Sequence, residues 1–194
     1  MLAMPNIDYT EEIGEAAFYG PKLDVNVKPA VGNEYTLSTC QLDFCLPMKF
    51  DLKYVSKDGD KKTPVVLHRA ILGSLDRFMA YILEETKGAL PLWLSPTQIN
   101  VIPVNNEYHT EYANKIYELL KDNGFRVNID LRDEKLSYKM RESQTKKIPY
   151  TLILGDKEKE NNNISYRCFG NTDTKTIDTH EFILLLKEQI RDKK

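Results

Sequence analysis

The chain has 194 residues, of which 41% are apolar and 29% are charged, and its formal net charge is −2. A normal apolar fraction, with 9 glycines and 9 prolines, excludes collagen-like, low-complexity and disordered proteins. The longest apolar run, Phe182–Leu186, is far shorter than the ~20 residues of a membrane span, and the first five residues carry no secretory signal. These properties predict a cytoplasmic protein without a membrane partner, and the small net charge alone predicts no nucleic-acid partner.

Cysteine is scarce and irregularly spaced. The cysteines are Cys40, Cys45 and Cys168. Their odd number and the lack of Cys-x-x-Cys spacing indicate reduced thiols rather than a disulfide framework or a self-contained zinc site.

The first half of the chain is predicted to contain strands followed by one helix. Apolar and polar side chains alternate over residues 22–28 and 39–44, and residues 65–71 form a third candidate strand. Apolar side chains then recur at helical spacing over 75–83, after Ser74 as N-cap. The pattern predicts an antiparallel sheet with one face on the helix and the other polar. A polar sheet face is usually solvated, but mixed donors and acceptors also suit a polar ligand.

A proline-rich break over residues 88–96 separates this part from a second one, so the predicted domains are 1–96 and 97–194. In the second part strands and helices alternate, which predicts right-handed β-α-β units and a mainly parallel sheet. The candidate strands are 99–104, 127–131, 150–154 and 164–168, and the candidate helices are 113–120, 134–147 and 179–192. Residues 158–163 are predicted to form a polar loop.

Several stretches, in order along the chain, resemble one enzyme family. They are Gly14–Asp24 (GEAAFYGPKLD), Ser38–Phe44 (STCQLDF), His68–Phe78 (HRAILGSLDRF), Leu131–Lys135 (LRDEK), Ile148–Tyr150 (IPY) and Gly155–Glu158 (GDKE). The first two resemble the catalytic sheet of threonyl-tRNA synthetases, and the third resembles that family's version of the third class II synthetase motif. The last three resemble its anticodon-binding domain. The resemblance implies an α/β protein: a partial class II antiparallel sheet with a motif 3 helix, then an α/β domain whose mainly parallel, mixed sheet is flanked by helices.

The activity implied by the resemblance is that of a threonine–tRNA ligase, which uses ATP with Mg²⁺, and the chain would be a truncated portion of it. Arg77 occupies the place of the motif 3 arginine that contacts the triphosphate, where a planar guanidinium can bind two phosphate oxygens. Lys22 and Gln41 are implied as catalytic, and with Tyr19 they match positions lining the threonine and adenylate pocket, beside Ser74. Taken alone, these residues could equally be a turn aromatic, a surface lysine, a strand glutamine and a helix cap.

His68 corresponds to one of three zinc ligands in the family, the others being a cysteine and a second histidine. Neither has a counterpart in this sequence, and one histidine does not make a zinc site. Because these two ligands and the first two class II motifs are missing, the chain alone is expected to be inactive, and it is expected to retain little zinc. Members of the family form homodimers, and the state of this chain is left open.

Basic residues gather in the second part. Residues 132–147 contain six basic and three acidic side chains, which is typical of a solvated helix face but also suits RNA. The positions that match family residues near the anticodon are Lys135, Arg141, Lys147, Glu158 and Arg167. Lys139 and Lys146 are expected to add electrostatic attraction. The implied partners are threonine tRNA, threonine and ATP, with no DNA.

Two other functions fit parts of the pattern. One is a non-catalytic tRNA-binding module or a truncated synthetase paralogue, which the absence of the first two class II motifs favours. The other is an accessory subunit that pairs with a polymerase or another synthetase. The synthetase-like stretch His68–Phe78 argues against the accessory subunit, which has no need of it.

Overall fold

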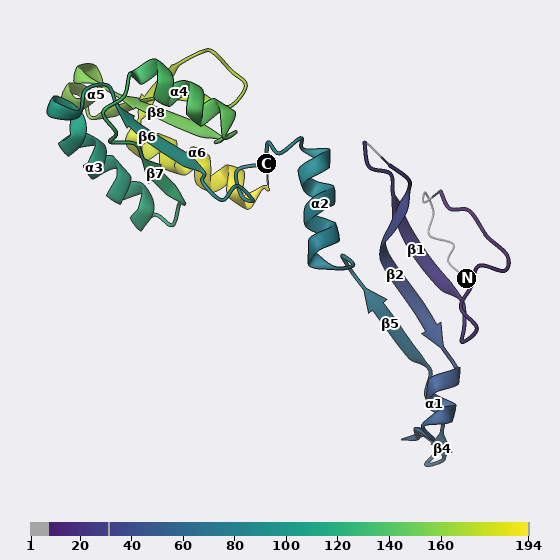
Figure 1. The fold of residues 1–194 in the computed structure, drawn as a ribbon. Helices are drawn as coiled ribbons and strands as arrows, with labels where there is room; N and C mark the ends of the chain where they lie inside the picture. The colour runs from purple at the N-terminus through teal and green to yellow at the C-terminus, as the bar shows by residue number, and fades with distance from the viewer. Residues whose placement is uncertain (1–7, 31, 194) are drawn as a thin grey trace. The chain divides into compact units, whose positions relative to one another are not determined.

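The computed structural model describes residues 8–30 and 32–193. The first residues, where the sequence predicts no secretory signal, lie outside this range. The chain divides into two compact units, one up to Tyr81 and one from Ile82, and each unit is described by itself (Figure 1).

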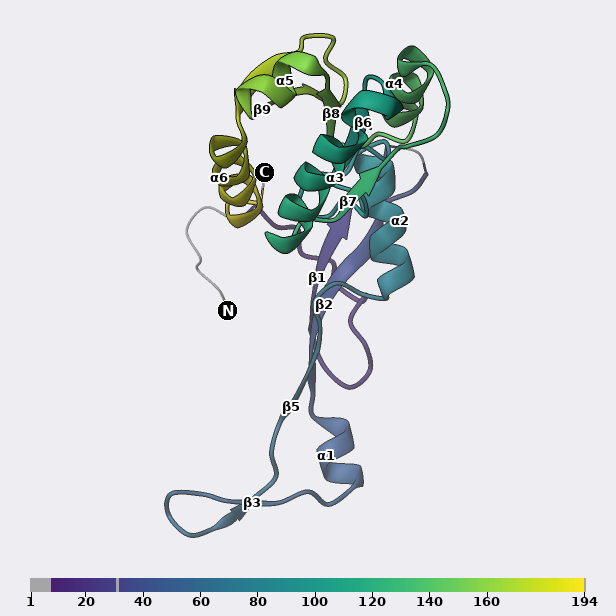
Figure 2. The same ribbon diagram turned by 90° about the vertical axis from the view of Figure 1, so that its left-hand side faces the viewer.

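The first unit is built on a three-stranded antiparallel sheet in the order β1-β2-β5. Its strands are β1 (Lys22–Val27), β2 (Tyr35–Asp43) and β5 (Val66–Ala70). Between β2 and β5 lie α1 (Cys45–Lys49) and a small hairpin of β3 (Tyr54–Val55) and β4 (Lys61–Lys62), seen in Figure 2. After β5, α2 (Leu75–Glu85) begins in the first unit. The predicted strands and the predicted helix are thus present.

One expectation for this sheet is wrong: α2 does not cover its apolar face. Leu23, Val25 and Leu67 on that face are 50%, 49% and 57% exposed, and α2 buries none of its own residues. Alternation in the sequence correctly identifies which side chains share a face. It does not say what packs against that face, because this depends on the path of the chain between elements.

The second unit contains a five-stranded mixed sheet in the order β10-β9-β8-β6-β7. Strands β6, β7 and β8 are parallel, and β9 and β10 continue the sheet antiparallel. The strands are β6 (Ile99–Pro103), β7 (Val127–Ile129), β8 (Tyr150–Leu154), β9 (Asn163–Cys168) and β10 (Lys175–Asp178). The helices after Ile82 are α3 (Asn106–Asp122), α4 (Leu136–Thr145), α5 (Asp156–Asn161) and α6 (Thr179–Arg191). In the described part of the chain, no helix is long and apolar enough to cross a membrane.

A hydrophobic core lies between one face of this sheet and helices α3 and α6. From the strands come Ile99, Val101 and Leu152, all fully buried, and from α3 comes Ile116. Phe182 of α6 is fully buried too, and its ring lies 5.1 Å from that of Tyr166 and 5.5 Å from that of Tyr150. Burial of this apolar surface is the main force that holds the second unit together.

The predicted polar loop at 158–163 is instead the end of α5 followed by the start of β9. The carboxylate of Glu158 accepts a hydrogen bond of 2.9 Å from the backbone N–H of Gly155 and so caps the start of α5. The helix ends at Asn161, and its C-cap Asn162 has a φ of 54°, in the left-handed region that asparagine tolerates. A six-residue polar helix has no apolar stripe, so periodicity does not reveal it. Strand β10 was not predicted either.

Candidate functional site

The first unit assembles four of the predicted site residues on one face of its sheet. Lys22, Gln41 and His68 are opposite one another on β1, β2 and β5 and form a row across the three strands. The hydroxyl of Tyr19 donates a hydrogen bond of 3.1 Å to Oε1 of Gln41, and its ring meets that of His68 edge-on at 6.3 Å between centroids. The row thus presents an amine, an amide, an imidazole and a phenol together.

Two carboxylates that the sequence reasoning missed hold this row in place. Oδ2 of Asp43 lies 2.8 Å from Nε2 of His68, and the Asp43 side chain is fully buried. Burial opposes ionisation of Asp43, but hydrogen bonds from His68 and from two backbone N–H groups at the start of α1 keep its pKa below the usual value. Asp24 pairs with Lys22 at 2.7 Å, and its hydrogen bond raises the pKa of the Lys22 amine.

Arg77 and Ser74 lie apart from this row. The hydroxyl of Ser74 accepts the backbone N–H of Arg77 at 3.4 Å, as an N-cap would. The guanidinium of Arg77 lies over the ring of Tyr35 at 5.8 Å from the centroid. Tyr35 is the first residue of β2 and lies six positions before Gln41, about 20 Å along a strand.

The described residues do not fit a zinc ion at His68. Nε2 of His68 is hydrogen-bonded to Asp43, so the candidate ligands at this place are the side chains of His68 and Asp43. Over residues 8–30 and 32–193, no group of three or more histidine, cysteine, aspartate or glutamate side chains is placed to hold a metal. A structural zinc site takes four protein ligands and a catalytic one takes three.

In the second unit a polar row crosses the sheet face opposite the hydrophobic core. By strand register, Asn128, Asn100, Thr151 and Arg167 are neighbours on β7, β6, β8 and β9. Nδ2 of Asn128 donates to Oδ1 of Asn100 at 2.7 Å, and the Thr151 hydroxyl lies 2.6 Å from that of Ser143 on α4. Helix α4 therefore lies over the middle of the row and leaves its two ends on either side.

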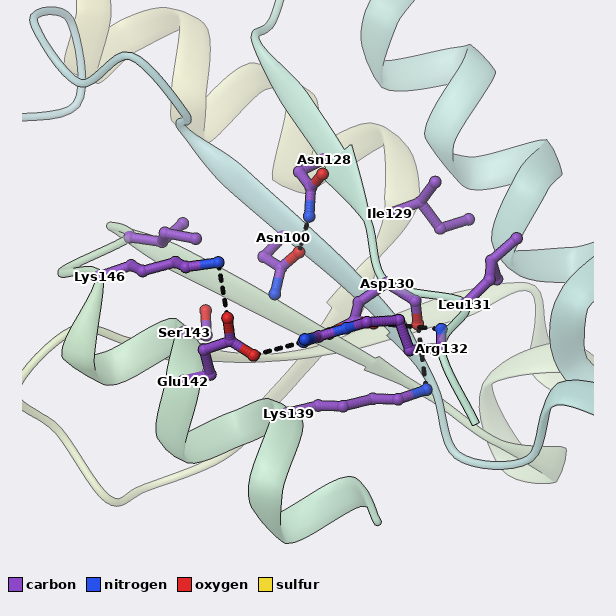
Figure 3. Close-up of a pocket in the computed structure, with 11 residues that line it drawn as sticks. Asn100, Asn128, Ile129, Asp130, Leu131, Arg132, Lys139, Glu142, Ser143 and Lys146 are labelled. Atoms are coloured by element: carbon purple, nitrogen blue, oxygen red, sulfur yellow. Dashed lines mark hydrogen bonds and ion pairs between the residues drawn. The ribbon is translucent and has the colours of Figure 1, made fainter. Parts of the chain in front are cut away.

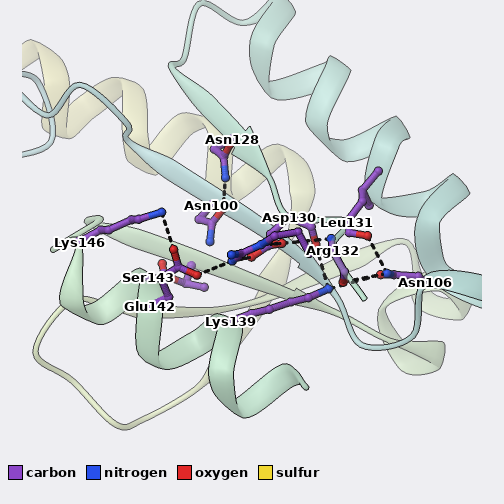
Figure 4. A network of polar contacts seen from close by, with 11 residues as sticks. Asn100, Asn106, Asn128, Asp130, Leu131, Arg132, Lys139, Glu142, Ser143 and Lys146 are labelled. Carbon is purple, nitrogen blue, oxygen red and sulfur yellow. Dashed lines mark hydrogen bonds and ion pairs between the residues drawn. The ribbon is translucent and has the colours of Figure 1, made fainter. Parts of the chain in front are cut away.

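A pocket of about 310 Å³ lies at the β7 end of this row, between the sheet and α4 (Figure 3). A network of ion pairs lines it (Figure 4). Arg132 bridges Asp130, at 2.7 Å, and Glu142, while Lys146 pairs with Glu142 at 2.7 Å. The hydrogen bond from Arg132 is the main cause that lowers the pKa of the buried Asp130 carboxyl, and hydrogen bonds from Asp130 and Glu142 raise the pKa of Arg132.

The basic residues on and around α4 differ in whether they can reach a ligand. Lys135 and Arg141 are exposed. Lys139, expected to attract RNA, is only 2% exposed, and its ammonium donates to the Asp130 carbonyl at 3.1 Å, so that expectation is wrong for Lys139. The ammonium of Lys147 donates to the carbonyl of Lys87.

Arg167 and Glu158 lie toward the β10 side of the sheet. The guanidinium of Arg167 donates from Nη2 to Thr174 at 3.1 Å, while its buried Nε has no hydrogen-bond partner among the described residues. Glu158 accepts from the hydroxyl of Ser165 at 2.6 Å as well as from Gly155. One oxygen of Glu158 thus fastens α5 to β9, and the other caps the start of α5.

Sequence reasoning missed the polar residues inside the apolar strands. Asn100, Thr151 and Ser165 are 4%, 0% and 6% exposed, although they belong to segments rich in isoleucine, leucine and tyrosine. The sequence did contain a sign of these positions, because each polar residue points to the opposite face of the sheet from the apolar residues next to it in its strand. Apolar neighbours on both sides masked it.

Two family models match consecutive parts of the chain. Residues 4–86 match the tRNA synthetase class II core domain (G, H, P, S and T), and residues 98–189 match the anticodon binding domain.

Curated relatives match nearly the whole chain. A threonine–tRNA ligase of Oceanobacillus iheyensis is 52% identical over 189 residues, and one of Staphylococcus carnosus is 55% identical over 188 residues. Each match covers 97% of this chain and 29% of the relative.

Solved structures share the fold. The crystal structure of the RNA binding domain of threonyl-tRNA synthetase from Cryptosporidium parvum Iowa II is similar with a TM-score of 0.82 and 37% identity, covering 90% of this chain and 44% of that one. A prolyl-tRNA synthetase from Cryptosporidium parvum, solved with L-proline and AMP, has a TM-score of 0.74 at 18% identity and covers 94% of this chain and 41% of that one. The chain belongs to the threonyl-tRNA synthetase family and joins part of a class II core domain to an anticodon-binding domain.

Proposed function

We propose that the chain is part of a cytoplasmic threonine–tRNA ligase and that its second half binds the anticodon arm of threonine tRNA. The observation that carries this proposal is Arg167, a position that matches the family's anticodon residues and whose buried Nε has no acceptor in the described part of the chain. A buried donor without a partner is costly, and a nucleobase edge would supply the acceptor once the Arg167 side chain moves to meet it. The functional division is proposed at 1–96 and 97–194, which the matches at 4–86 and 98–189 support.

The rest of the anticodon set divides into two roles in this proposal. Lys135 and Arg141 are exposed, so they attract phosphates without reading sequence. Lys147 and Arg167 contact unstacked bases through their edges. Glu158 positions the nearby strand β9 through Ser165 and stays close to the bound RNA.

The proposal is tested by binding of the 194-residue chain to threonine tRNA and to a version with a swapped anticodon, at two salt concentrations. Arg141→Ala is expected to weaken both complexes alike and to lower the slope of log affinity against log salt by about 0.7 to 0.9, as for one lost phosphate contact. The anticodon swap is expected to weaken tRNA binding by the unmutated chain about tenfold, by analogy with base readout in DNA. The same swap is expected to weaken tRNA binding by the Arg167→Ala variant much less.

Lys121→Ala is the matched control, since this α3 lysine has a side chain that is 57% exposed and lies away from α4. It is expected to leave both affinities unchanged. Equal binding of the two tRNAs by the unmutated chain would reduce the site to a basic surface and end the anticodon assignment.

For the first half, we propose a contribution to the threonine and ATP site, with Mg²⁺ bound alongside ATP. Tyr19, Lys22 and Gln41 would contact threonine and the adenylate, and Arg77 beside Ser74 would contact the triphosphate. His68 would be one zinc ligand of a larger ligase, which would act as a homodimer. Because the chain spans 29% of its relatives' length, it is proposed to be inactive alone.

This proposal predicts that the 194-residue chain does not catalyse threonine-dependent exchange of pyrophosphate into ATP. The row of Lys22, Gln41 and His68 provides contacts to one part of the reactants, while Arg77 lies about 20 Å along β2 from it. Exchange above a blank, abolished by Arg77→Ala, would contradict the prediction. Absence of exchange together with anticodon-dependent binding is the expected result, and the second candidate function, a non-catalytic tRNA-binding module, shares it.

A further inference from the structure

The pocket between β6, β7 and α4 contains a polar group that has no hydrogen-bond partner among the described residues. Asn100 is only 4% exposed, and its Oδ1 accepts the hydrogen bond from Asn128. This bond fixes the amide so that Nδ2 of Asn100 points into the pocket, as Figures 3 and 4 show. Within the described ranges, Nδ2 donates to no protein acceptor. The amide donor of Asn100 is therefore available to a ligand that enters the pocket.

The pocket offers both donors and acceptors. Besides Nδ2 of Asn100, its lining includes the guanidinium of Arg132 and the ammonium of Lys146 as donors. The carboxylates of Asp130 and Glu142 are acceptors on the same lining. A phosphate would meet these two carboxylates unfavourably, whereas a nucleobase edge displays acceptors and donors side by side.

The shape of the pocket also suits a ring. Ile129 and Ile148 contribute apolar surface beside the polar groups, and the volume of about 310 Å³ is ample for one base. Asn100 and Arg167 belong to one cross-strand row, with Thr151 between them, so the two lie about two strand spacings apart, roughly 10 Å. The pocket and Arg167 therefore share one face of the second unit, on either side of α4.

We propose that this pocket receives one unstacked nucleobase of the anticodon arm, with Asn100 and Arg132 reading its edge and Asn128 orienting Asn100. The inference rests on the proposed function, because it assumes that the second unit binds that arm. It adds a second point of base recognition, separate from Arg167 and built from residues outside the anticodon set inferred above.

The test is a set of double-mutant cycles on the 194-residue chain. Asn128→Ala is the first variant, since Asn128 is exposed on the edge strand β7 and its loss should spare the fold. Asn100→Ala is the second, with its folding checked by thermal melting. Each is measured against threonine tRNAs in which one anticodon-loop nucleotide at a time is abasic. Asn114→Ala is the matched control, because Asn114 is an exposed residue of α3.

At one loop position, removal of the base and Asn128→Ala are each expected to weaken binding about tenfold, and together no more than either alone. At every other position, and for Asn114→Ala throughout, the effects are expected to multiply. Multiplying effects at every position, with anticodon-dependent binding intact, would overturn the pocket proposal alone. If the unmutated chain binds the swapped and the normal tRNA equally, or binds neither, both proposals fail.

Discussion

Phe182→Ala is expected to lower the free energy of unfolding of the second unit by about 3–5 kcal/mol, the usual cost of removing a fully buried aromatic ring. Phe182 is 0% exposed and its ring packs against those of Tyr150 and Tyr166. Its removal leaves a cavity between α6 and the sheet, and the two tyrosine rings lose their shared neighbour.

Urea unfolding followed by the fluorescence of Trp93, the single tryptophan, measures this loss. Trp93 belongs to the second unit, where its carbonyl accepts a hydrogen bond of 2.9 Å from Arg126. Leu184→Ala is the matched control, because Leu184 lies on the same helix and is 53% exposed. A loss below about 1 kcal/mol for Phe182→Ala, within the range of surface substitutions, would show that α6 does not close the core.

Asp130→Asn is expected to destabilise the second unit by about 2 kcal/mol at neutral pH, because a hydrogen-bonded carboxylate is replaced by a neutral amide. Arg132 donates to Asp130 from Nε at 2.9 Å and from Nη2 at 2.7 Å, and its backbone N–H donates at 3.2 Å. Asparagine keeps one acceptor and nearly the same shape, so the change removes the charge and one acceptor without opening a cavity.

The effect of Asp130→Asn is expected to depend on pH. Since the folded-state pKa of Asp130 is lowered, chiefly by the hydrogen bond from Arg132, its stabilisation is fully present above the unfolded value of about 3.9. It is lost as the pH falls through the lower folded-state pKa. Urea midpoints of the two proteins should therefore converge below about pH 4, whereas exposed Asp173→Asn should change little at any pH. A gap that stays constant into acid would contradict the assigned cause.

The strands and the long helices of the second unit followed from the sequence because their apolar residues repeat at clear periods. The helix predicted over 113–120 is the middle of α3, which ends with Asn123 as C-cap and Gly124 at a φ of 87°. Helix α5 and strand β10 escaped because they are short, polar and held by tertiary hydrogen bonds, such as the one between Ser165 and Thr176 at 2.8 Å. Local periodicity carries no information about such partners.

The sequence predicted which residues belong to the candidate sites better than it predicted their contacts and orientations. Resemblance placed Tyr19, Lys22 and Gln41 in one pocket beside Ser74 and made His68 a zinc ligand. The strand register and a hydrogen bond bring the first three together with His68, whereas Ser74 lies apart. Resemblance gave no sign of the buried Asp43 that holds His68, since a lone aspartate at the end of a strand resembles a turn residue. Nor did it show that Asn100 points into a pocket, because the orientation of a buried amide depends on Asn128 from a strand 28 residues away in the chain.

The ion-pair network around α4 has a consequence for how this unit would choose among RNAs. Arg132 and Lys146 are balanced by carboxylates, and Lys139 is enclosed, so three of the six basic side chains in residues 132–147 do not face a ligand as free charges. A charge that is already paired displaces few counterions when RNA arrives. All tRNAs carry the same phosphate backbone, so attraction by charge treats them alike. Because many basic side chains of this surface are already paired, a smaller share of the affinity for RNA comes from phosphate attraction. A larger share then comes from contacts to bases, which differ from one tRNA to another.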